Sequence, residues 1–329
     1  MKRIAVIGGG AWGTALAQVA ASAGAVTLWA RDVDVVAAID ERHQNPAFLP
    51  GVALAPAIAA TSDMTSALSG AEAALIVVPA QFLRGVLQQL AVVAFTSQLP
   101  LLLCAKGIET GSLKTMSEIA AEIVPQAPVA VLSGPSFAGE VARALPTAVT
   151  IASQDEALAA AFAARLGTAR FRPYTSGDPI GVELGGAVKN VMAIACGIVE
   201  GRRLGDNARA ALITRGLAEM VRLGIAKGAQ PETFRGLSGL GDLVLTCSAR
   251  QSRNYSLGVA LGQGKSLQEA LHGSRAVVEG IATASAVARL AARLGIEMPI
   301  TAAVDTVLHG GMAIDMMIEA LLSRPYRSE

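Results

Sequence analysis

A glycine-rich turn close to the N-terminus constrains the fold of this chain more than any other feature. The short, mostly apolar run at 3–7 leads into the sequence GGGAWG at 8–13, and a helix-like stretch follows over 14–22. In a strand–turn–helix unit the first glycine allows the tight turn, the second lets a pyrophosphate approach the backbone, and the third lets helix and strand pack closely. Gly8, Gly10 and Gly13 therefore predict a dinucleotide-binding turn. A tight turn without a ligand is the alternative interpretation.

Strand-length apolar runs continue along the first half of the chain and stop near residue 180. After the run at 3–7, further strands are expected at 26–29, 74–78, 99–104, 129–132, 148–152 and 169–172. Helix-length segments lie between several of them, a pattern typical of a mostly parallel sheet that helices cover on both faces. Residues 1–180 are therefore predicted to form a Rossmann-type dinucleotide-binding domain.

The second half of the chain is predicted to be helical throughout. Helices are expected at 184–200, 208–227, 256–261, 267–272, 281–294 and 313–322, with glycine-rich joints at 236–241 and 310–311. The boundary falls near 175–182, where a turn-like Ser-Gly-Asp-Pro occupies 176–179. The predicted fold class is α/β, with an all-α substrate and catalytic domain over 181–329.

The charge balance and the cysteine count exclude several classes of protein. Twenty-seven Lys and Arg residues against 26 Asp and Glu leave a formal net charge of +1, without the basic excess typical of a nucleic-acid-binding domain. The three cysteines are odd in number and too widely spaced for a disulfide framework, and with the three histidines they form no metal-ligand spacing. We expect a cytoplasmic protein without a metal or a nucleic-acid partner.

Hydropathy alone would suggest a membrane protein, because its mean value is +0.48. A spanning helix needs about 20 consecutive apolar residues, however, and every long apolar run here contains a charge, a proline or a glycine. The N-terminus also has the outline of a secretory signal peptide, with two basic residues, an apolar stretch and Ala-Ser-Ala at 21–23. Glycines 8–10 would lie in the middle of its apolar segment, where a helix is needed. We expect neither membrane insertion nor secretion.

The residues after the second expected strand bear on the choice between the two nicotinamide dinucleotides. An acidic side chain there would hold the ribose 2′-hydroxyl of NAD, whereas an arginine nearby would meet the 2′-phosphate of NADP. The chain reads Trp-Ala-Arg-Asp at 29–32. Arg31 favours NADP and Asp32 leaves NAD open, while a solvated Arg31 without a role is the alternative.

Two isolated charges stand in apolar surroundings. The segment 184–199 is apolar apart from Lys189 and Asn190, and an unpaired ammonium is costly inside a core. Burial lowers the pKa of a lysine toward neutrality, which suits a general acid and base. Asp242, flanked by glycine and leucine, is the natural partner of Lys189. A lysine whose side chain reaches the surface is the alternative.

Two loops and one polar cluster lie where ligands are expected. Lys106 follows the strand at 99–104 and Gly134 follows the strand at 129–132, and ligands of open parallel sheets bind beyond the carboxyl ends of the strands. Ser-Arg-Asn at 252–254 precedes the helix that starts near 255. This cluster can bind an anion through backbone N–H groups and the guanidinium fork, or it can simply cap the helix.

Seven motifs occur along nearly the whole chain. They are GGGAWGTALA at 8–17, KGIE at 106–109, SGPSFAGE at 133–140, ELGGAVKNV at 183–191, GLGDLVLTC at 239–247, SRN at 252–254 and VVEG at 277–280. In this order they resemble the motifs of the bacterial NAD(P)-dependent glycerol-3-phosphate dehydrogenase family. Ala11 departs from the family pattern, because many members carry serine there. A backbone contact to the pyrophosphate would survive this change, and a hydroxyl contact would not.

The resemblance implies reversible hydride transfer between NAD(P)H and dihydroxyacetone phosphate, giving sn-glycerol 3-phosphate for phospholipid synthesis. It makes Lys189 the proton acceptor and donor, with Lys106 and Asp242 as further catalytic residues. The implied substrate-binding residues are Lys106, Gly134, Ser136, Lys189, Asp242, Ser252, Arg253 and Asn254. The implied cofactor-binding residues are Gly8, Gly10, Ala11, Trp12, Gly13, Arg31, Lys106, Ala138, Arg253, Val277 and Glu279, with NADP favoured over NAD.

Two other functions would use the same fold, and fold alone does not decide between them. One is another two-domain dehydrogenase, of the hydroxyacid or 6-phosphogluconate type, against which the SRN and KGIE motifs count. The other is a non-catalytic dinucleotide-binding sensor, which would have no need to bury Lys189 and Asp242. The apolar helical half is compatible with a homodimer face or a packed core. The sequence leaves the oligomeric state, the preferred cofactor, feedback regulation and the direction of reaction in the cell open.

Overall fold

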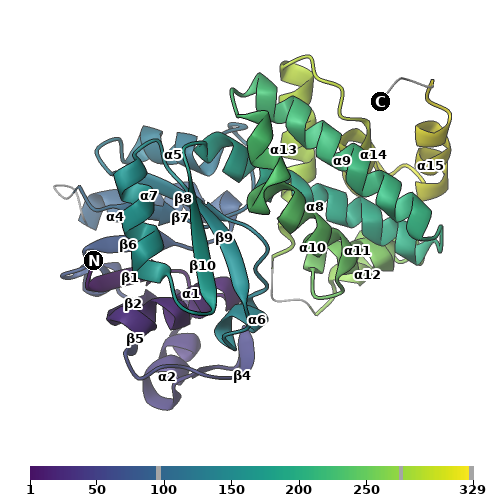
Figure 1. The fold of residues 1–329 in the computed structure, drawn as a ribbon. Coiled ribbons are helices and arrows are strands. Elements are labelled where there is room, and N and C mark those ends of the chain that lie inside the picture. The colour runs from purple at the N-terminus through teal and green to yellow at the C-terminus, as the bar shows by residue number, and fades with distance from the viewer. Residues whose placement is uncertain (94–97, 274–276, 326–329) are drawn as a thin grey trace.

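Eight strands form the central sheet of the first half of the chain in a computed structural model that describes residues 1–93, 98–273 and 277–325 (Figure 1). The strands, in their order across the sheet, are β10 (Phe171–Ser176), β9 (Thr147–Ala152), β8 (Val129–Ser133), β7 (Leu101–Leu103), β6 (Ala73–Ile76), β1 (Arg3–Ile7), β2 (Ala25–Trp29) and β5 (Ile58–Thr61). Neighbouring strands are parallel except β8 and β9. The prediction of a mostly parallel sheet is confirmed.

Helices cover both faces of this sheet, which explains why its strands are apolar runs without alternation. In β1, Ile4 and Val6 join the apolar cluster under α1 and α7, whereas Ala5 and Ile7 join the cluster under α4 and α5. The covering elements are α1 (Ala11–Ala20), η1 (Ala21–Ala23), α2 (Val33–Arg42), α3 (Met64–Leu68), η2 (Ala80–Phe82), α4 (Leu83–Val93), α5 (Met116–Ile123), α6 (Ala138–Ala142) and α7 (Glu156–Leu166). A separate hairpin pairs β3 (Gln44–Asn45) with β4 (Leu49–Ala53).

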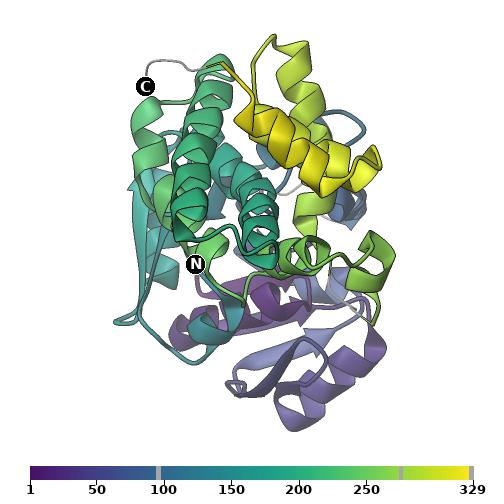
Figure 2. The same cartoon turned by 90° about the vertical axis from the view of Figure 1, so that its right-hand side faces the viewer.

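The helix α8 (Pro179–Gly201) lies at the centre of the second half of the chain, and it is buried from Gly181 to Val199. Its start follows from the sequence, because Pro179 suits the first helical turn and the Asp178 carboxylate accepts the N–H of Gly181 at 2.9 Å. The surrounding elements are α9 (Asp206–Ala226), η3 (Pro231–Arg235), η4 (Leu237–Gly241), α10 (Asp242–Ser248), α11 (Arg253–Gly262), α12 (Leu267–Leu271), α13 (Glu279–Arg293), α14 (Pro299–His309) and α15 (Ile314–Leu322) (Figure 2).

The long helix α8 also passes from one half of the molecule into the other. Val182 belongs to the sheet-side cluster that contains Ile7, and Leu184 begins the cluster of the helical half. The helix is long and apolar enough to cross a membrane, but its whole apolar window is buried inside the protein. A buried core helix has the same composition as a membrane span, so the apolar residues of α8 are explained by packing.

Two glycines let α8 and α11 touch backbone to backbone. A Cβ on Gly197 of α8 would lie 2.1 Å from the carbonyl oxygen of Tyr255, and a Cβ on Gly258 of α11 would lie 2.1 Å from that of Ile194. No side chain fits at these distances. The two helices that carry Lys189 and Arg253 are therefore held at a fixed separation.

The fold class is confirmed, but the strands β3, β4 and β5 are not among the predicted strands, and the structure differs from the prediction at three further places. Residues 236–241, expected to be a joint, contain the π-helical turn η4, which leads directly into α10. The last strand is β10 rather than 169–172, because the Thr168 hydroxyl accepts the N–H groups of residues 170 and 171 in a turn. The helix α14 is not among the predicted helices, because its N-terminus is capped from α9, where Glu219 accepts the N–H groups of residues 300 and 301.

The structure changes from strands to helices close to the predicted boundary. The strand β10 ends at Ser176, and α8 begins at Pro179. The predicted domain boundary between residues 180 and 181 therefore falls inside the first turn of α8. The division into two domains at this point stays a prediction.

Candidate active site between the sheet and the helical half

Three charged side chains meet beyond the carboxyl end of β7. Lys106, three residues after this strand, donates to Asp242 Oδ2 at 2.8 Å, and Lys189 of α8 donates to Asp242 Oδ1 at 2.6 Å. The predicted pairing of Lys189 with Asp242 is confirmed. Asp242 is 1% exposed as the first residue of α10, so its carboxylate is shielded from solvent and shared by two ammonium groups.

Burial determines the proton affinity of this cluster. It lowers the pKa of Lys189 to about 8, a shift that the negative charge of Asp242 opposes and the positive charge of Lys106 reinforces. Burial would raise the pKa of Asp242, but the two ammonium groups outweigh it and hold that pKa below its usual value. At neutral pH the cluster contains an ionised carboxylate and a lysine that releases its proton readily.

Four neutral groups fix the positions of the two lysines. The carbonyl oxygen of Gly134 accepts from Lys106 Nζ at 2.9 Å, and the Thr246 hydroxyl accepts from Lys189 Nζ at 3.0 Å. The Asn190 amide donates to the backbone carbonyl of Lys106 at 3.1 Å, and the Ser136 hydroxyl donates to the carbonyl of Gly134. The loop after β8 therefore meets the loop after β7, as the order of the strands predicts.

A second polar cluster lies at the N-terminus of α11. Ser252 caps this helix by accepting the N–H of Tyr255 at 3.2 Å, and Arg253 donates to the carbonyl oxygen of Val277 at 2.8 Å. Asn254 connects this cluster to the lysines, because its amide donates to Asn190 Oδ1 at 2.9 Å. Burial lowers the pKa of Arg253, and Glu279 opposes this shift.

Glu279 connects the helical half to the sheet. Its Oε1 accepts the N–H of Ala80 at 3.1 Å, while its buried Oε2 has no hydrogen-bond partner among the described residues. Burial raises the pKa of Glu279 to about 7. The free oxygen lies close to Gly107, next to Lys106. It is suited to a ligand that carries an amide or hydroxyl donor.

The glycine-rich turn has the geometry that a dinucleotide requires. Gly8 has a φ of 134°, and a Cβ on Gly13 would lie 1.8 Å from the carbonyl oxygen of Gly8. The N-terminus of α1 has neither a side-chain cap nor an acidic residue in its first turn, so its N–H groups are available to an anion. The buried indole N–H of Trp12 has no hydrogen-bond partner among the described residues. These groups fit the phosphates and polar edges of NAD(P).

One residue that supports this turn is not indicated by any pattern in the sequence. Asn45 of the β3–β4 hairpin is fully buried, and its amide donates to the carbonyl oxygen of Gly9 at 2.9 Å and to the Thr14 hydroxyl at 2.8 Å. Its Oδ1 accepts the N–H of Phe48. Because the hairpin lies outside every motif, no local pattern connects Asn45 with the glycines.

The two charged residues after β2 differ in their contacts. Asp32 caps α2 by accepting the N–H of Asp34 at 3.0 Å. Arg31 is exposed, and no partner of its guanidinium lies within the described part of the chain. The arginine is therefore available to a ligand, while the carboxylate is already engaged by a helix.

The structure gathers the predicted site residues into three adjoining groups and leaves Arg31 at the end of β2. The groups are Lys106, Gly134, Ser136, Lys189 and Asp242; Ser252, Arg253, Asn254, Val277 and Glu279; and Gly8, Gly10, Ala11, Trp12, Gly13 and Ala138. Asn190 and Thr246 were not predicted as site residues. Thr246 lies one helical turn after Asp242, a spacing that could have identified it.

Comparison with known proteins gives consistent results over the whole chain. The family model described as the N-terminus of NAD-dependent glycerol-3-phosphate dehydrogenase matches residues 3–159, and the model of its C-terminus matches 178–319. Proteins named glycerol-3-phosphate dehydrogenase (NAD(P)+) are 60% identical in Rhodospirillum rubrum and 57% identical in Caulobacter vibrioides. Both alignments cover all of this chain, and they cover 94% of the Rhodospirillum protein and 99% of the Caulobacter protein. A crystal structure of glycerol-3-phosphate dehydrogenase from Coxiella burnetii matches with a TM-score of 0.95 and 41% identity, over 98% of this chain and 99% of that one.

Proposed function

The chain belongs to the NAD-dependent glycerol-3-phosphate dehydrogenase family, and from this premise we propose which of its side chains perform each part of the reaction. The protein is an oxidoreductase that transfers a hydride reversibly between NAD(P)H and dihydroxyacetone phosphate, and reduction gives sn-glycerol 3-phosphate. This product supplies the glycerophosphate backbone for phospholipid synthesis. The bound nicotinamide supplies or accepts the hydride, so the protein must bind the substrate, orient it and move one proton.

Lys189 moves that proton. During reduction its ammonium group donates a proton to the carbonyl oxygen of the substrate, and during oxidation its neutral amine removes the proton from the hydroxyl. The observation that carries this assignment is the buried Lys189–Asp242 pair at 2.6 Å, with the pKa of Lys189 lowered to about 8. A general acid and base works best when its pKa lies near the working pH.

Lys106 and Asp242 hold the proton donor in place. Asp242 accepts from both lysines, and the backbone carbonyl of Gly134 fixes Lys106 from the opposite side. The positive charge of Lys106 stabilises negative charge that develops on the substrate oxygen. Thr246 and Asn190 keep the two lysines aligned.

The N-terminus of α11 binds the phosphate of the substrate. Arg253 offers its guanidinium, Ser252 and Asn254 offer side-chain donors, and the loop with Gly134 and Ser136 closes the opposite side. A helix N-terminus with a guanidinium beside it is a strong site for a phosphate. One hydrogen bond from Arg253 to the carbonyl of Val277 leaves its other N–H groups for the anion.

The glycine-rich turn would hold the cofactor, with its nicotinamide end toward the lysine cluster. Gly8, Gly10 and Gly13, with the first turn of α1 at Ala11 and Trp12, hold the pyrophosphate. Ala138, Val277 and Glu279 line the remainder of the path, and Lys106 and Arg253 contact both ligands. Arg31 binds the 2′-phosphate of NADP, since Asp32 is engaged in capping α2. NADP is therefore the favoured cofactor, and NAD is the second.

Absorbance at 340 nm tests this function directly. Purified protein is mixed with dihydroxyacetone phosphate and either NADPH or NADH, and each control mixture lacks one component. We expect a fall that requires both substrate and cofactor and is faster with NADPH. No fall with either cofactor, in protein that still binds the cofactor, would contradict the proposed reaction.

A further inference from the structure

The loop that carries Lys106 has no regular secondary structure, although the proposed reaction needs this lysine at a fixed place. Residues 104–115, all within the described part of the chain, contain neither helix nor strand between the end of β7 and the start of α5. A long side chain on an irregular loop samples many positions unless the backbone beneath it is held. The position of the Lys106 ammonium therefore depends on what anchors this loop.

One glutamine holds the loop by three hydrogen bonds. Gln81, in η2 after the strand β6, donates from Nε2 to the carbonyl oxygen of Ile108 at 2.8 Å. Its Oε1 accepts the backbone N–H and the hydroxyl of Thr110, each at 3.0 Å. A backbone carbonyl only accepts and a backbone N–H only donates, so these partners fix the orientation of the amide. The side chain thus joins the segment after β6 to the loop two residues beyond Lys106.

Contacts from two other elements hold the same loop. Arg84 of α4 forms a two-point ion pair with Glu109, in which the Nε–Oε1 and Nη2–Oε2 distances are both 2.9 Å. From the helical half, Asn190 donates to the backbone carbonyl of Lys106 at 3.1 Å. Of these three anchoring side chains, Gln81 is the one that binds two residues of the loop.

The residue between Lys106 and Ile108 is packed closely against η2. A Cβ on Gly107 would lie 2.7 Å from the Cβ of Ala80, the chain neighbour of Gln81. The hydrogen bonds of Gln81 therefore keep the loop pressed against η2 directly beside the lysine.

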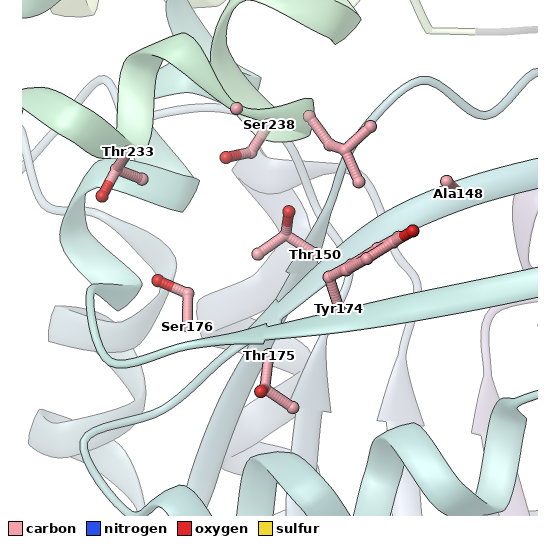
Figure 3. A pocket seen from close by; sticks show the side chains of 9 residues that line it. Ala148, Thr150, Tyr174, Thr175, Ser176, Thr233 and Ser238 are labelled. Carbon is pink, nitrogen blue, oxygen red and sulfur yellow. The ribbon is translucent and has the colours of Figure 1, made fainter.

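The partner of Lys106 has incomplete packing on the side of the sheet. Asp242 follows η4, and a cavity of about 400 Å³ opens between η4 and the strands β9 and β10 (Figure 3). Ser238 lines this cavity from η4, and Thr150 and Tyr174 line it from the strands. The anchors of the Lys106 loop therefore contribute more to the position of the Lys106–Asp242 pair than the strands beside η4 do.

We propose that Gln81 is a positioning residue of the reaction, whose amide holds the loop so that the Lys106 ammonium stays against Asp242. The proposal rests on the proposed function, which assigns Lys106 to the catalytic cluster. A displacement of about 1 Å in an active site can lower a rate about 100-fold. An amide that binds the loop two residues from Lys106 therefore controls turnover without contacting either ligand.

Backbone hydrogen exchange in the protein without ligands tests the anchoring itself. Gln81→Met keeps the length of the side chain and removes all three hydrogen bonds. Exchange over residues 106–113 should become at least about tenfold faster, because the loop opens more often and the N–H of Thr110 loses its acceptor. Gln88→Met, at an exposed position of α4, is the matched control and should exchange like the wild type. Unchanged exchange in Gln81→Met would overturn the proposal.

The pH dependence of turnover separates a displaced Lys106 from a general loss of stability. In the described structure Asp242, Lys106 and the Cys247 thiol, which burial keeps protonated by raising its pKa, are the ionisable side chains that act on Lys189. The positive charge of Lys106 contributes to lowering the pKa of Lys189 to about 8. Gln81→Met should lower kcat for reduction about tenfold, and its fall with pH should move to higher pH. A lower kcat with the pH dependence of the wild type would contradict the proposal.

A double variant tests whether Gln81 acts through Lys106. Lys106→Ala alone should lower kcat/KM by at least about 100-fold, because it removes a charge from the catalytic cluster. Adding Gln81→Met to it should change kcat/KM less than about twofold, since the side chain that Gln81 positions is already absent. If the losses of the two single variants multiply instead, Gln81 acts independently of Lys106 and the proposal is wrong.

A milder variant covers the case in which Gln81→Met does not fold. Thr110→Val preserves the shape of the side chain and removes one of the three hydrogen bonds, so kcat should fall about two- to threefold. Wild-type kinetics of this variant, beside an unfolded Gln81→Met, would limit Gln81 to a role in folding and reject the proposal. Wild-type protein without any turnover would contradict the proposed function, whereas the hydrogen exchange would still measure the anchoring by Gln81.

Discussion

Burial gives Lys189 the proton affinity that a dehydrogenase needs at neutral pH. An exposed lysine stays protonated up to pH values near 10, and such a group could donate a proton but would rarely accept one. In the described structure, burial lowers the pKa of Lys189 to about 8 although Asp242 opposes this shift. The same side chain therefore serves both directions of the reaction.

The two directions should depend on pH in opposite ways. Reduction of dihydroxyacetone phosphate requires the ammonium form of Lys189, so its kcat should fall as the pH rises through about 8. Oxidation of glycerol 3-phosphate requires the amine, so its kcat should rise over the same interval. Initial rates at 340 nm between pH 6.5 and 9.5 measure both.

A truncated side chain provides the control for this pH dependence. Lys189→Ala should lower kcat by about 10²- to 10⁴-fold, the usual contribution of general acid–base catalysis, while NADPH binding measured by fluorescence is kept. Lys265→Ala removes an exposed lysine from the helical half and should have wild-type rates. Near-normal turnover of the Lys189 variant would remove it from the proton-transfer step.

Arg253 should act mainly on substrate affinity. Because its guanidinium is assigned to the substrate phosphate, Arg253→Ala should raise the KM for dihydroxyacetone phosphate by about 10- to 100-fold, with a smaller change in kcat. Arg250→Ala is the matched control, since its side chain is 78% exposed only three residues earlier. Steady-state kinetics at saturating NADPH measure the effect, and an unchanged KM would contradict the assignment.

Arg31 should determine the choice of cofactor. Its loss in Arg31→Ala should raise the KM for NADPH by about tenfold and leave the KM for NADH nearly unchanged, because only NADPH carries the 2′-phosphate. Arg42→Ala, at the opposite end of α2, is the control. If both KM values rise equally, the arginine does not contact the 2′-phosphate.

At the scale of the elements, close glycine contacts set the distance between α8 and α11, the helices that carry Lys189 and Arg253. Gly258→Ala would place a Cβ 2.1 Å from the carbonyl oxygen of Ile194 and force the helices apart. We expect a loss of about 1–3 kcal/mol in the free energy of unfolding, the usual cost of overpacking. A shift of the urea unfolding midpoint to lower concentration measures it.

An exposed glycine gives the opposite result and serves as the control. Gly85 of α4 has no heavy atom within 4 Å of its hypothetical Cβ, so Gly85→Ala should raise the free energy of unfolding by about 0.5–1 kcal/mol. If Gly258→Ala is as stable as the wild type, then the two backbones separate without cost and α8 and α11 do not form a fixed unit.

The elements that could be predicted from the sequence are those whose signals are local. The β1–turn–α1 unit and the apolar strands follow from glycines and apolar runs, and the pairing of Lys189 with Asp242 follows from two charges that each stand isolated in an apolar segment of the sequence. The helix α14 could not be predicted in this way, because its cap is Glu219 of α9, 81 residues before Ile300. Asn45 is a similar case, since its partner Gly9 lies 36 residues earlier.

At the scale of the whole molecule, a buried carboxylate connects the two halves. Glu183 of α8 accepts the N–H of Ser117 at 2.8 Å, at the N-terminus of α5. Burial raises the pKa of Glu183 to about 7, although the hydrogen bonds from Ser117 oppose this shift. In the folded protein Glu183 therefore keeps its proton over a pH range in which the unfolded chain has lost it.

This difference makes Glu183 a source of pH-dependent stability. Between about pH 4.5 and 7 the folded state binds more protons at this position than the unfolded state, so the contribution of Glu183 to stability falls as the pH rises. Glu183→Gln stays neutral, so the difference between its urea unfolding midpoint and that of the wild type should increase in favour of the variant from pH 5 to pH 7. A constant difference between the two proteins across this range would contradict the raised pKa.

The continuity of α8 has a consequence for attempts to take this protein apart. Val182 packs in the core beside the sheet, and the α8 residues from Leu184 onward pack in the core of the helical half. The border between the two cores therefore lies inside α8. A chain cut at residue 180 would leave a gap in the first fragment and an unpaired apolar turn on the second. We therefore expect the two halves, separated at this residue, to fold less well than the intact chain.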